Sequence, residues 1–191
     1  MINLKGNQLI LASKSPRRQE LLKGLCVDFE VRTKETPEDF PETMSASKVS
    51  AFLSEKKAKA FLGELADDEI VLTSDTVVIL EGKILGKPEN AEEARKMLTD
   101  LSAKQHKVST GITLLSNTKS ITLQDEASVF FKPLSQEEID FYIDNFRPFD
   151  KAGAYGIQEW IGYIGVKRLE GSFYTVMGLP VHLVYQALKD W

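Results

Sequence analysis

One segment constrains the fold of this chain more than any other, the run Glu69–Leu80 with the sequence EIVLTSDTVVIL. It is rich in β-branched residues and almost entirely apolar, which predicts a strand that is buried on both faces. Helix-like and strand-like segments alternate around it along the chain. We therefore expect an α/β domain with a mixed sheet, in which a cleft between two halves of the sheet is the natural ligand site.

Periodicity predicts the other elements. Strands are expected at residues 9–11, 29–33, 107–115 and 120–132, the last two as an antiparallel pair that turns at Asn117. Helices are expected from Pro16 to Gly24, over residues 47–65, and after Asn90, Ser135 and Pro180. The glycine-dense stretch 151–165 is expected to be a loop.

Local patterns add detail to four of these helices. Ser15 is a good N-cap before Pro16, and the pairs Asn90 with Glu93 and Ser135 with Glu138 resemble capping boxes. Apolar side chains at helical spacing predict the buried face of the helix over 47–65, formed by Val49, Phe52, Leu53 and Ala60.

Length and composition bound the class of protein. The chain has 191 residues, 42% of them hydrophobic, which suffices for a sizeable core, and we expect one domain over 1–191. A single cysteine, Cys26, excludes an intrachain disulfide and suits the reducing cytoplasm. No apolar run approaches the ~18 residues of a membrane span, and the first residues do not resemble a signal peptide. A net charge of −4 gives no support for nucleic-acid binding, so we expect neither nucleic acid nor membrane as a partner.

The segment SKSPRR at 13–18 places two arginines in the first turn of a helix. Positive charge at this end opposes the helix dipole, so the placement makes sense if an anion docks there. A solvated basic turn is the alternative, and this segment alone favours neither strongly.

Asp75 lies in the middle of the apolar strand. A carboxylate in such a place is costly unless it is paired with a cation or hydrogen-bonded. It could serve as a metal ligand or as a general base, or the strand could simply end or bulge there. The residue by itself leaves these alternatives open.

Two lysines lie near apolar segments. Lys57 shares the helical face of Leu53, where snorkelling past the edge of the core is the simpler explanation. Lys87 follows the buried strand within the triplet GKP at 86–88. The stretch 82–88 superficially resembles a phosphate-binding P-loop. Its glycine spacing is one residue short, and proline replaces the required serine or threonine, which excludes that motif.

The segment KAGAYGIQ at 151–158 surrounds one tyrosine with small residues, which would let a ligand approach the backbone closely. Gln158 offers both a donor and an acceptor, although a tight structural loop is the simpler interpretation. Carboxylates also occur in a proline-flanked loop, at Glu35, Glu38 and Asp39. The two histidines have no partner at metal-ligand spacing, and no serine-hydrolase elbow is present.

Taken in order, these segments resemble the Maf family along almost the whole chain. The matching pieces are ASKSPRR at 12–18, KA at 57–58, SDTVV at 74–78, GKP at 86–88, STG at 109–111, KAGAYGIQ at 151–158 and GLP at 178–180. The resemblance implies an elongated mixed sheet flanked by helices, with two lobes around a central substrate cleft, close in fold to the inosine-triphosphate pyrophosphatases. It also implies a homodimer that hydrolyses the bond between the α and β phosphates of a nucleoside triphosphate.

The resemblance assigns roles to individual residues. Asp75 matches the catalytic aspartate, the base for the attacking water and a contact for the metal. Magnesium or manganese would bridge phosphate oxygens, and Glu38 is the expected loop carboxylate that helps to hold it. Glu35 and Asp39 are the alternatives to Glu38. The positions that bind the triphosphate are matched by Ser13, Arg18, Lys57 and Lys87.

Within the family, the choice of nucleotide base correlates with the residues at the positions that Arg17, Thr76 and Gln158 match in this chain. The sequence KAGAYGIQ resembles that of the subgroup that acts on dTTP and UTP. The resemblance implies that modified pyrimidine triphosphates are further candidate substrates. A pyrimidine edge presents two carbonyls beside an imide N–H, which an amide and a guanidinium can match. Two other functions stay open: a nucleotide-binding regulator of septum formation without turnover, and a pyrophosphatase that prefers 7-methyl-GTP.

Overall fold

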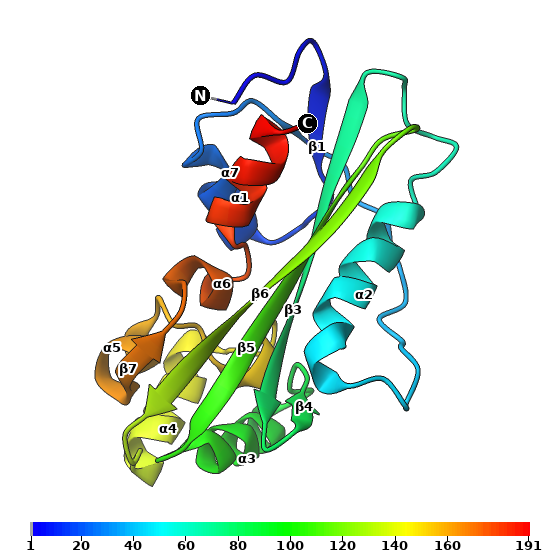
Figure 1. Cartoon of the computed structure of the whole chain (residues 1–191). Helices are drawn as coiled ribbons and strands as arrows, with labels where there is room; N and C mark the ends of the chain where they lie inside the picture. Colours follow the sequence, from blue (N-terminus) through cyan, green and yellow to red (C-terminus); the bar gives the residue numbers. More distant parts are fainter. Residues whose placement is uncertain (1) are drawn as a thin grey trace. The chain divides into compact units, whose positions relative to one another are not determined.

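The computed structural model describes residues 2–191 (Figure 1). The strands are β1 (Gln8–Leu11), β2 (Glu30–Val31), β3 (Glu69–Leu80), β4 (Lys83–Leu85), β5 (Gln105–Leu115), β6 (Ser120–Phe131) and β7 (Val166–Glu170). The helices are α1 (Pro16–Lys23), α2 (Ala46–Lys59), α3 (Ala91–Leu101), α4 (Gln136–Phe146), η1 (Ala152–Ala154), α5 (Trp160–Gly165), α6 (Phe173–Met177) and α7 (Val181–Lys189).

The strands form one mixed sheet of seven strands in the order β2-β1-β3-β5-β6-β7, with β4 paired to β3. β1 runs parallel to β2 and β3, whereas β4 is antiparallel to β3 and β7 to β6. β5 and β6 are joined by only four residues, closed by the Ser116 N–H on the Lys119 carbonyl at 2.8 Å. Only antiparallel neighbours accept so short a connection. The predicted α/β class, mixed sheet and hairpin are therefore confirmed.

The chain divides into two compact units. The first contains the described residues up to Asp75 together with Thr110–Asp125 and Gly178–Trp191, and the second contains Thr76–Ser109 and Glu126–Met177. β3, β5 and β6 each contribute residues to both units.

In the first unit, strand periodicity sorts the side chains onto two faces of the sheet. One face packs with α1 and α7 in a cluster that includes Leu9, Leu11, Leu22, Ile70, Leu72, Ile112, Leu114, Val184 and Leu188. The alternate strand residues pack with the end of α2 and the turns after it, in a cluster of Ile10, Ala58, Phe61, Leu65, Val71 and Leu115. Helices thus cover both faces of β3, as its apolar sequence requires (Figure 1).

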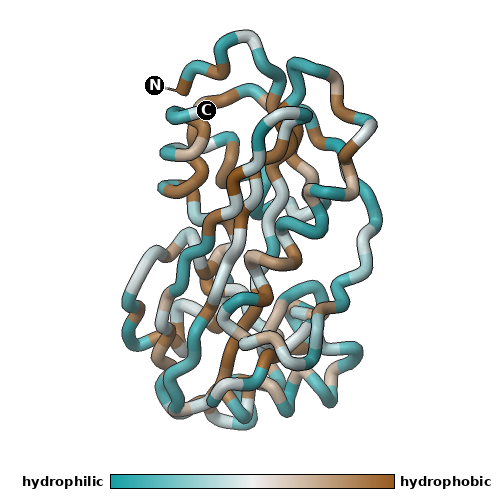
Figure 2. The backbone as a smooth tube through the Cα atoms, turned by 45° about the vertical axis from the view of Figure 1, so that its right-hand side comes forward, coloured by the Kyte–Doolittle hydropathy of each residue, from teal (hydrophilic) through white to brown (hydrophobic). Residues whose placement is uncertain are grey.

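The second unit has a core of its own. It packs α3, α4 and the segment that contains η1 and α5 against strand residues such as Val78, Val108, Val129 and Phe131. Tyr142 of α4 is the bulkiest of its fully buried side chains. Figure 2 shows hydrophobic stretches along the long strands and hydrophilic residues along the connecting loops. None of the described helices is long and apolar enough to cross a bilayer.

Several predicted boundaries are wrong. α2 ends at Lys59 instead of residue 65, because the chain turns there and Gly63 adopts a φ of +82°. Its buried face consists of Val49, Ser50, Leu53, Ser54 and Ala58, so Phe52 and Ala60 are only partly buried. The strand predicted at 29–33 has two residues, and the predicted loop 151–165 contains η1 and α5. β4, β7 and α6 were not predicted, because each is a short element whose existence depends on its tertiary neighbours.

The three predicted helix caps differ in how many of their expected hydrogen bonds form. Ser135 and Glu138 form a complete capping box at α4. At α3, the Asn90 side chain accepts from the Glu93 N–H at 2.9 Å, but the Glu93 carboxylate accepts from the Glu89 N–H instead of closing the box. Ser15 occupies the predicted N-cap of α1 without a hydrogen bond from its side chain to the helix.

Candidate active site

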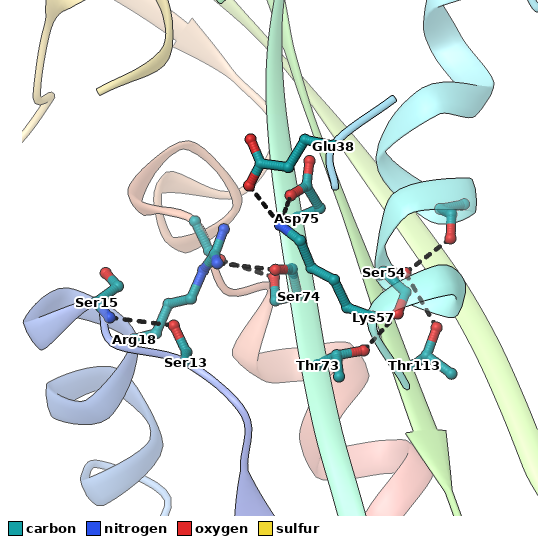
Figure 3. A network of polar contacts seen from close by, with 12 residues as sticks. Ser13, Ser15, Arg18, Glu38, Ser54, Lys57, Thr73, Ser74, Asp75 and Thr113 are labelled. Carbon is teal, nitrogen blue, oxygen red and sulfur yellow. Dashed lines mark hydrogen bonds and ion pairs between the residues drawn. The ribbon is translucent and has the colours of Figure 1, made fainter. Parts of the chain in front are cut away.

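Three of the predicted site residues meet at one ammonium group in the first unit (Figure 3). Nζ of Lys57 donates to Oδ1 of Asp75 and, at 2.8 Å, to Oε1 of Glu38. The Asp75 side chain is 9% exposed, that of Lys57 19% and that of Glu38 49%. The buried carboxylate thus has a cation beside it. Lys57 reaches a pair of carboxylates, so simple snorkelling to solvent does not describe it.

The direction of Asp75 follows from its place on β3. Thr73 and Asp75 are two residues apart on an unbroken strand, so both point to the face that α2 covers. The Thr73 hydroxyl donates to the backbone carbonyl of Ser54 on α2 at 2.6 Å. The Ser54 hydroxyl lies 3.0 Å from that of Thr113 on β5, which lies 3.0 Å from that of Thr122 on β6. This ladder of hydroxyls joins the helix that bears Lys57 to the strand that bears Asp75.

Gly111 on β5 allows α2 to approach the sheet closely. A Cβ atom at this position would overlap the Ser50 carbonyl oxygen and lie 2.5 Å from the Ala51 nitrogen, both in the backbone of α2. Any other residue at 111 would therefore push the helix away from the sheet. The glycine of the STG triplet at 109–111 thus has a structural role beside the site.

Arg18 lies against the other side of β3. Its Nε donates to the Gly178 carbonyl and its Nη1 to the Ser74 carbonyl, each at 2.8 Å. The Ser74 hydroxyl also donates to the Gly178 carbonyl, at 3.0 Å. Desolvation lowers the pKa of Arg18, and the negative charge of Asp75 partly offsets this effect. The guanidinium therefore stands close to Asp75 while it ties α1 to β3, and phosphate binding by Arg18 stays a prediction.

Hydrogen bonds between side chains and the backbone hold the segment before α1. Ser13 is buried, and its hydroxyl oxygen accepts from the Ser15 N–H at 3.2 Å. The side-chain amide of Gln19 donates to the Ser13 carbonyl at 3.3 Å. Arg17 is partly buried in the first turn of α1. The structure thus places Ser13, Arg17 and Arg18 at one end of α1 in the first unit.

The three early carboxylates have different partners. Glu35 pairs with Lys14 at 3.6 Å in an exposed position, and Asp39 pairs with Lys56 at 2.7 Å. The hydrogen bond from Lys56 lowers the pKa of Asp39. Of the three, Glu38 is the one that pairs with Lys57 beside Asp75. Among residues 2–191, no group of three or more His, Cys, Asp and Glu side chains could hold a metal by itself.

The other predicted residues belong to the second unit. Thr76 follows Asp75 on β3 and is partly exposed, and Lys87 is exposed after β4. Gln158 is half-buried between the end of η1 and the start of α5, in a segment whose residues 153–157 are buried.

Sequence reasoning missed the residues that support this site. Ser54 and Thr73 could have been found from their spacing, because one lies three residues before Lys57 and the other two before Asp75. Gly111 interrupts a strand pattern, which often marks a close backbone approach. No local pattern indicates which helix residue meets which strand residue.

Comparison with known proteins identifies the family of this chain. The family model described as Maf-like protein matches residues 8–191. A dTTP/UTP pyrophosphatase of Porphyromonas gingivalis is 48% identical over 99% of this chain and 96% of its own length. Proteins of the same name from Parabacteroides distasonis and Flavobacterium johnsoniae are 47% and 49% identical, over 99% and 97% of this chain and 98% and 95% of their own lengths.

Among solved structures, the Staphylococcus aureus Ham1 protein aligns with 65% of this chain and 72% of its own, at 17% identity and a TM-score of 0.45. That score is too low to support an argument about this fold. The sequence relatives, by contrast, span nearly their full lengths, and the family match runs from β1 to the last residue. This chain therefore belongs to the Maf family.

Proposed function

We propose that this chain is a nucleoside triphosphate pyrophosphatase that hydrolyses the α–β phosphate bond of dTTP and UTP, releasing the monophosphate and pyrophosphate. The observation that supports it best is the contact of Lys57 with both Asp75 and Glu38. Relatives with nearly half of their residues identical are named dTTP/UTP pyrophosphatases, which supports the substrate class.

In this proposal Asp75 is the general base. Water attack on a phosphate anion depends on positioning and on neutralisation of charge, more than on covalent chemistry by the protein. Asp75 would orient the attacking water and accept its proton. Lys57 and Lys87 would neutralise phosphate oxygens, and Ser13 and Arg18 would help to hold the triphosphate at the start of α1.

A divalent cation fits the donors that are present. Glu38 and Asp75 both reach one ammonium nitrogen, so their oxygens lie close enough to share a cation. Carboxylate oxygens are the ligands that magnesium and manganese prefer, and such ions commonly take their remaining ligands from phosphates and water. We propose that Glu38 and Asp75 hold Mg²⁺ or Mn²⁺, which would supply neutralisation of phosphate charge.

We propose that Gln158, Arg17 and Thr76 select the base. The amide of Gln158 can both donate to a carbonyl and accept from the imide N–H of uracil or thymine. Cytosine presents the opposite pattern at two of these positions, so an amide held in one orientation would discriminate against it. We also expect a homodimer, which light scattering coupled to size-exclusion chromatography would detect.

Pyrophosphate release tests the proposed function. The nucleotides are dTTP, UTP, CTP, GTP and 7-methyl-GTP, each with Mn²⁺ or Mg²⁺ and again with excess chelator. Chelator-sensitive hydrolysis of dTTP and UTP, with little of the others, is the expected result. Preferential hydrolysis of 7-methyl-GTP would support the proposed reaction and contradict the proposed substrates. Binding without turnover of any nucleotide would instead support the non-catalytic regulator.

A further inference from the structure

The backbone around Gln158 is closely packed against neighbouring atoms. A Cβ atom on Gly162 would overlap the Ile157 carbonyl, and one on Gly156 would lie 2.9 Å from Cδ of Glu159. The loop begins equally constrained, because Gly153 has a φ of +69° and its N–H donates to the Gly86 carbonyl at 2.9 Å. The segment thus follows a single tightly packed path within the second unit.

One side chain from a different element joins the two sides of Gln158. The hydroxyl of Tyr142, on α4, accepts from the Gly156 N–H at 3.0 Å and donates to Oε2 of Glu159. The other carboxylate oxygen of Glu159 pairs with Nζ of Lys151 at 3.1 Å. One buried phenol therefore bridges a residue two positions before Gln158 and a residue one position after it.

We propose that Tyr142 is a positioning residue for base selection, because its hydroxyl holds the backbone on both sides of Gln158 and so sets the direction of the Gln158 amide. This inference rests on the proposed function, in which Gln158 recognises the base. Tyr142 does not touch the nucleotide in this scheme. It acts by limiting the orientations that the amide can adopt, which matters for a hydrogen-bonding pattern that has to tell uracil from cytosine.

The role of the Tyr142 hydroxyl can be tested separately from that of the Tyr142 ring. The Tyr142 ring is stacked on Phe146 with centroids 5.2 Å apart and fills the core of the second unit, functions that phenylalanine retains. Tyr142→Phe would leave the Gly156 N–H without its acceptor and Oε2 of Glu159 without the hydroxyl that donates to it. The loop would then remain packed, while the backbone beside Gln158 lost two hydrogen bonds.

Tyr155 offers a matched control in the same loop. It is also a buried tyrosine, and its hydroxyl lies 2.7 Å from Nε2 of His106 on β5. Its ring packs edge-on against Phe131. Tyr155→Phe therefore removes one buried hydrogen bond in the same loop, without releasing either side of Gln158.

The experiment compares kcat/KM for UTP and CTP in wild type, Tyr142→Phe, Tyr155→Phe and Gln158→Ala, with thermal unfolding of each. We expect Tyr142→Phe to lower the ratio of kcat/KM for UTP to that for CTP by about tenfold, mainly through KM for UTP, and we expect the same direction of change for Gln158→Ala. Tyr155→Phe should lower the melting temperature while the ratio stays within about twofold. Should Tyr142→Phe fail to fold, Glu159→Gln weakens the same bridge and should reduce the ratio in the same direction.

The outcomes separate this inference from the function on which it rests. If Gln158→Ala shifts the ratio and folded Tyr142→Phe does not, the positioning role alone is overturned. Equal shifts for both tyrosine variants would also overturn it, because loosening of the core would then explain them. Unchanged selectivity in Gln158→Ala would show that Gln158 does not recognise the base. An inactive wild type would overturn the proposed function. Either result would also overturn the positioning role of Tyr142.

Discussion

Thr73 on β3 donates its hydroxyl proton to the backbone carbonyl of Ser54 on α2, over a distance of 2.6 Å (Figure 3). Asp75 lies two residues beyond the donor, and Lys57 lies three residues beyond the acceptor. The bond therefore fixes the helix along the strand at the register that brings the ammonium to the carboxylate. Both bonded groups are buried, so water does not compete for them.

The first prediction concerns this bond. Thr73→Val keeps the shape of the side chain and removes the hydroxyl, so we expect kcat to fall about tenfold through misplacement of Lys57. Stability should fall by about 1 kcal/mol. Thr73→Ser retains the hydroxyl and should recover most of the activity. Thr122→Val, at the far end of the hydroxyl ladder, is the control and should leave kcat near wild type. Equal activity of the valine and serine variants would contradict the role of the bond.

Asp75→Asn removes the charge of the expected base with little change in shape. We expect kcat to fall by about 100-fold or more, because an amide cannot accept the proton of the attacking water. The fold should persist, since Lys57 still has Glu38 as a partner. Single-turnover assays and circular dichroism measure the two effects. Retained turnover in a folded variant would exclude Asp75 as the base.

The three carboxylates at Glu35, Glu38 and Asp39 are expected to differ in their effect on metal binding. Glu38→Gln should raise the Mn²⁺ concentration for half-maximal activity by about tenfold or more, because one of two charged oxygen ligands is lost. Asp39→Asn and Glu35→Gln are matched controls, since they pair with Lys56 and Lys14 away from Asp75. A metal titration of activity measures all three. A larger effect in either control than in Glu38→Gln would assign the metal to another carboxylate.

Gly111→Ala tests the close approach of α2 to β5. The added methyl group would overlap the backbone at Ser50 and Ala51, so we expect a loss of about 3 kcal/mol in the free energy of unfolding. Activity should fall as well, because the same helix bears Lys57. Gly86→Ala meets open space and should change stability by less than about 0.5 kcal/mol. Urea denaturation distinguishes them, and similar stability of the two variants would contradict the predicted clash.

His106 predicts a pH dependence of stability. Burial lowers its pKa to about 4, and its Nδ1 has no hydrogen-bond partner among residues 2–191. Between the unfolded pKa of about 6.5 and this folded value, the unfolded state binds more protons, so stability falls as the pH decreases. From pH 7 to pH 5 this single group should cost about 2 kcal/mol.

His106→Gln provides the comparison for that prediction. Other groups also titrate in this range, so the quantity to measure is the difference between the pH dependences of wild type and variant in urea denaturation. The variant should lose the contribution of about 2 kcal/mol. Parallel curves for the two proteins would show that His106 does not resist protonation in the folded state.

Continuous patterns along the chain predicted the large elements well. β3 has the predicted bounds, because twelve consecutive residues suited to a doubly buried strand leave few alternatives. The capping box at Ser135 is also present as predicted, since both of its hydrogen bonds are local. α2 was extended too far because the apolar pattern continues through Phe61 and Leu65, which are buried in turns beyond the helix.

The sequence by itself determined the α/β class, the doubly buried strand with one carboxylate inside it, and the ordered motifs that indicate the family. The first two depend on local periodicity and composition, and the third depends on the resemblance of motifs, taken in order along the chain, to the Maf family. Only the tertiary structure decided that Lys57 and Glu38 meet at Asp75, that Thr73 binds the backbone of α2, and that Tyr142 bridges the residues beside Gln158. These contacts join segments that are 14 to 19 residues apart. Their geometry is set by packing of the helices on the sheet, which no local pattern in the chain specifies.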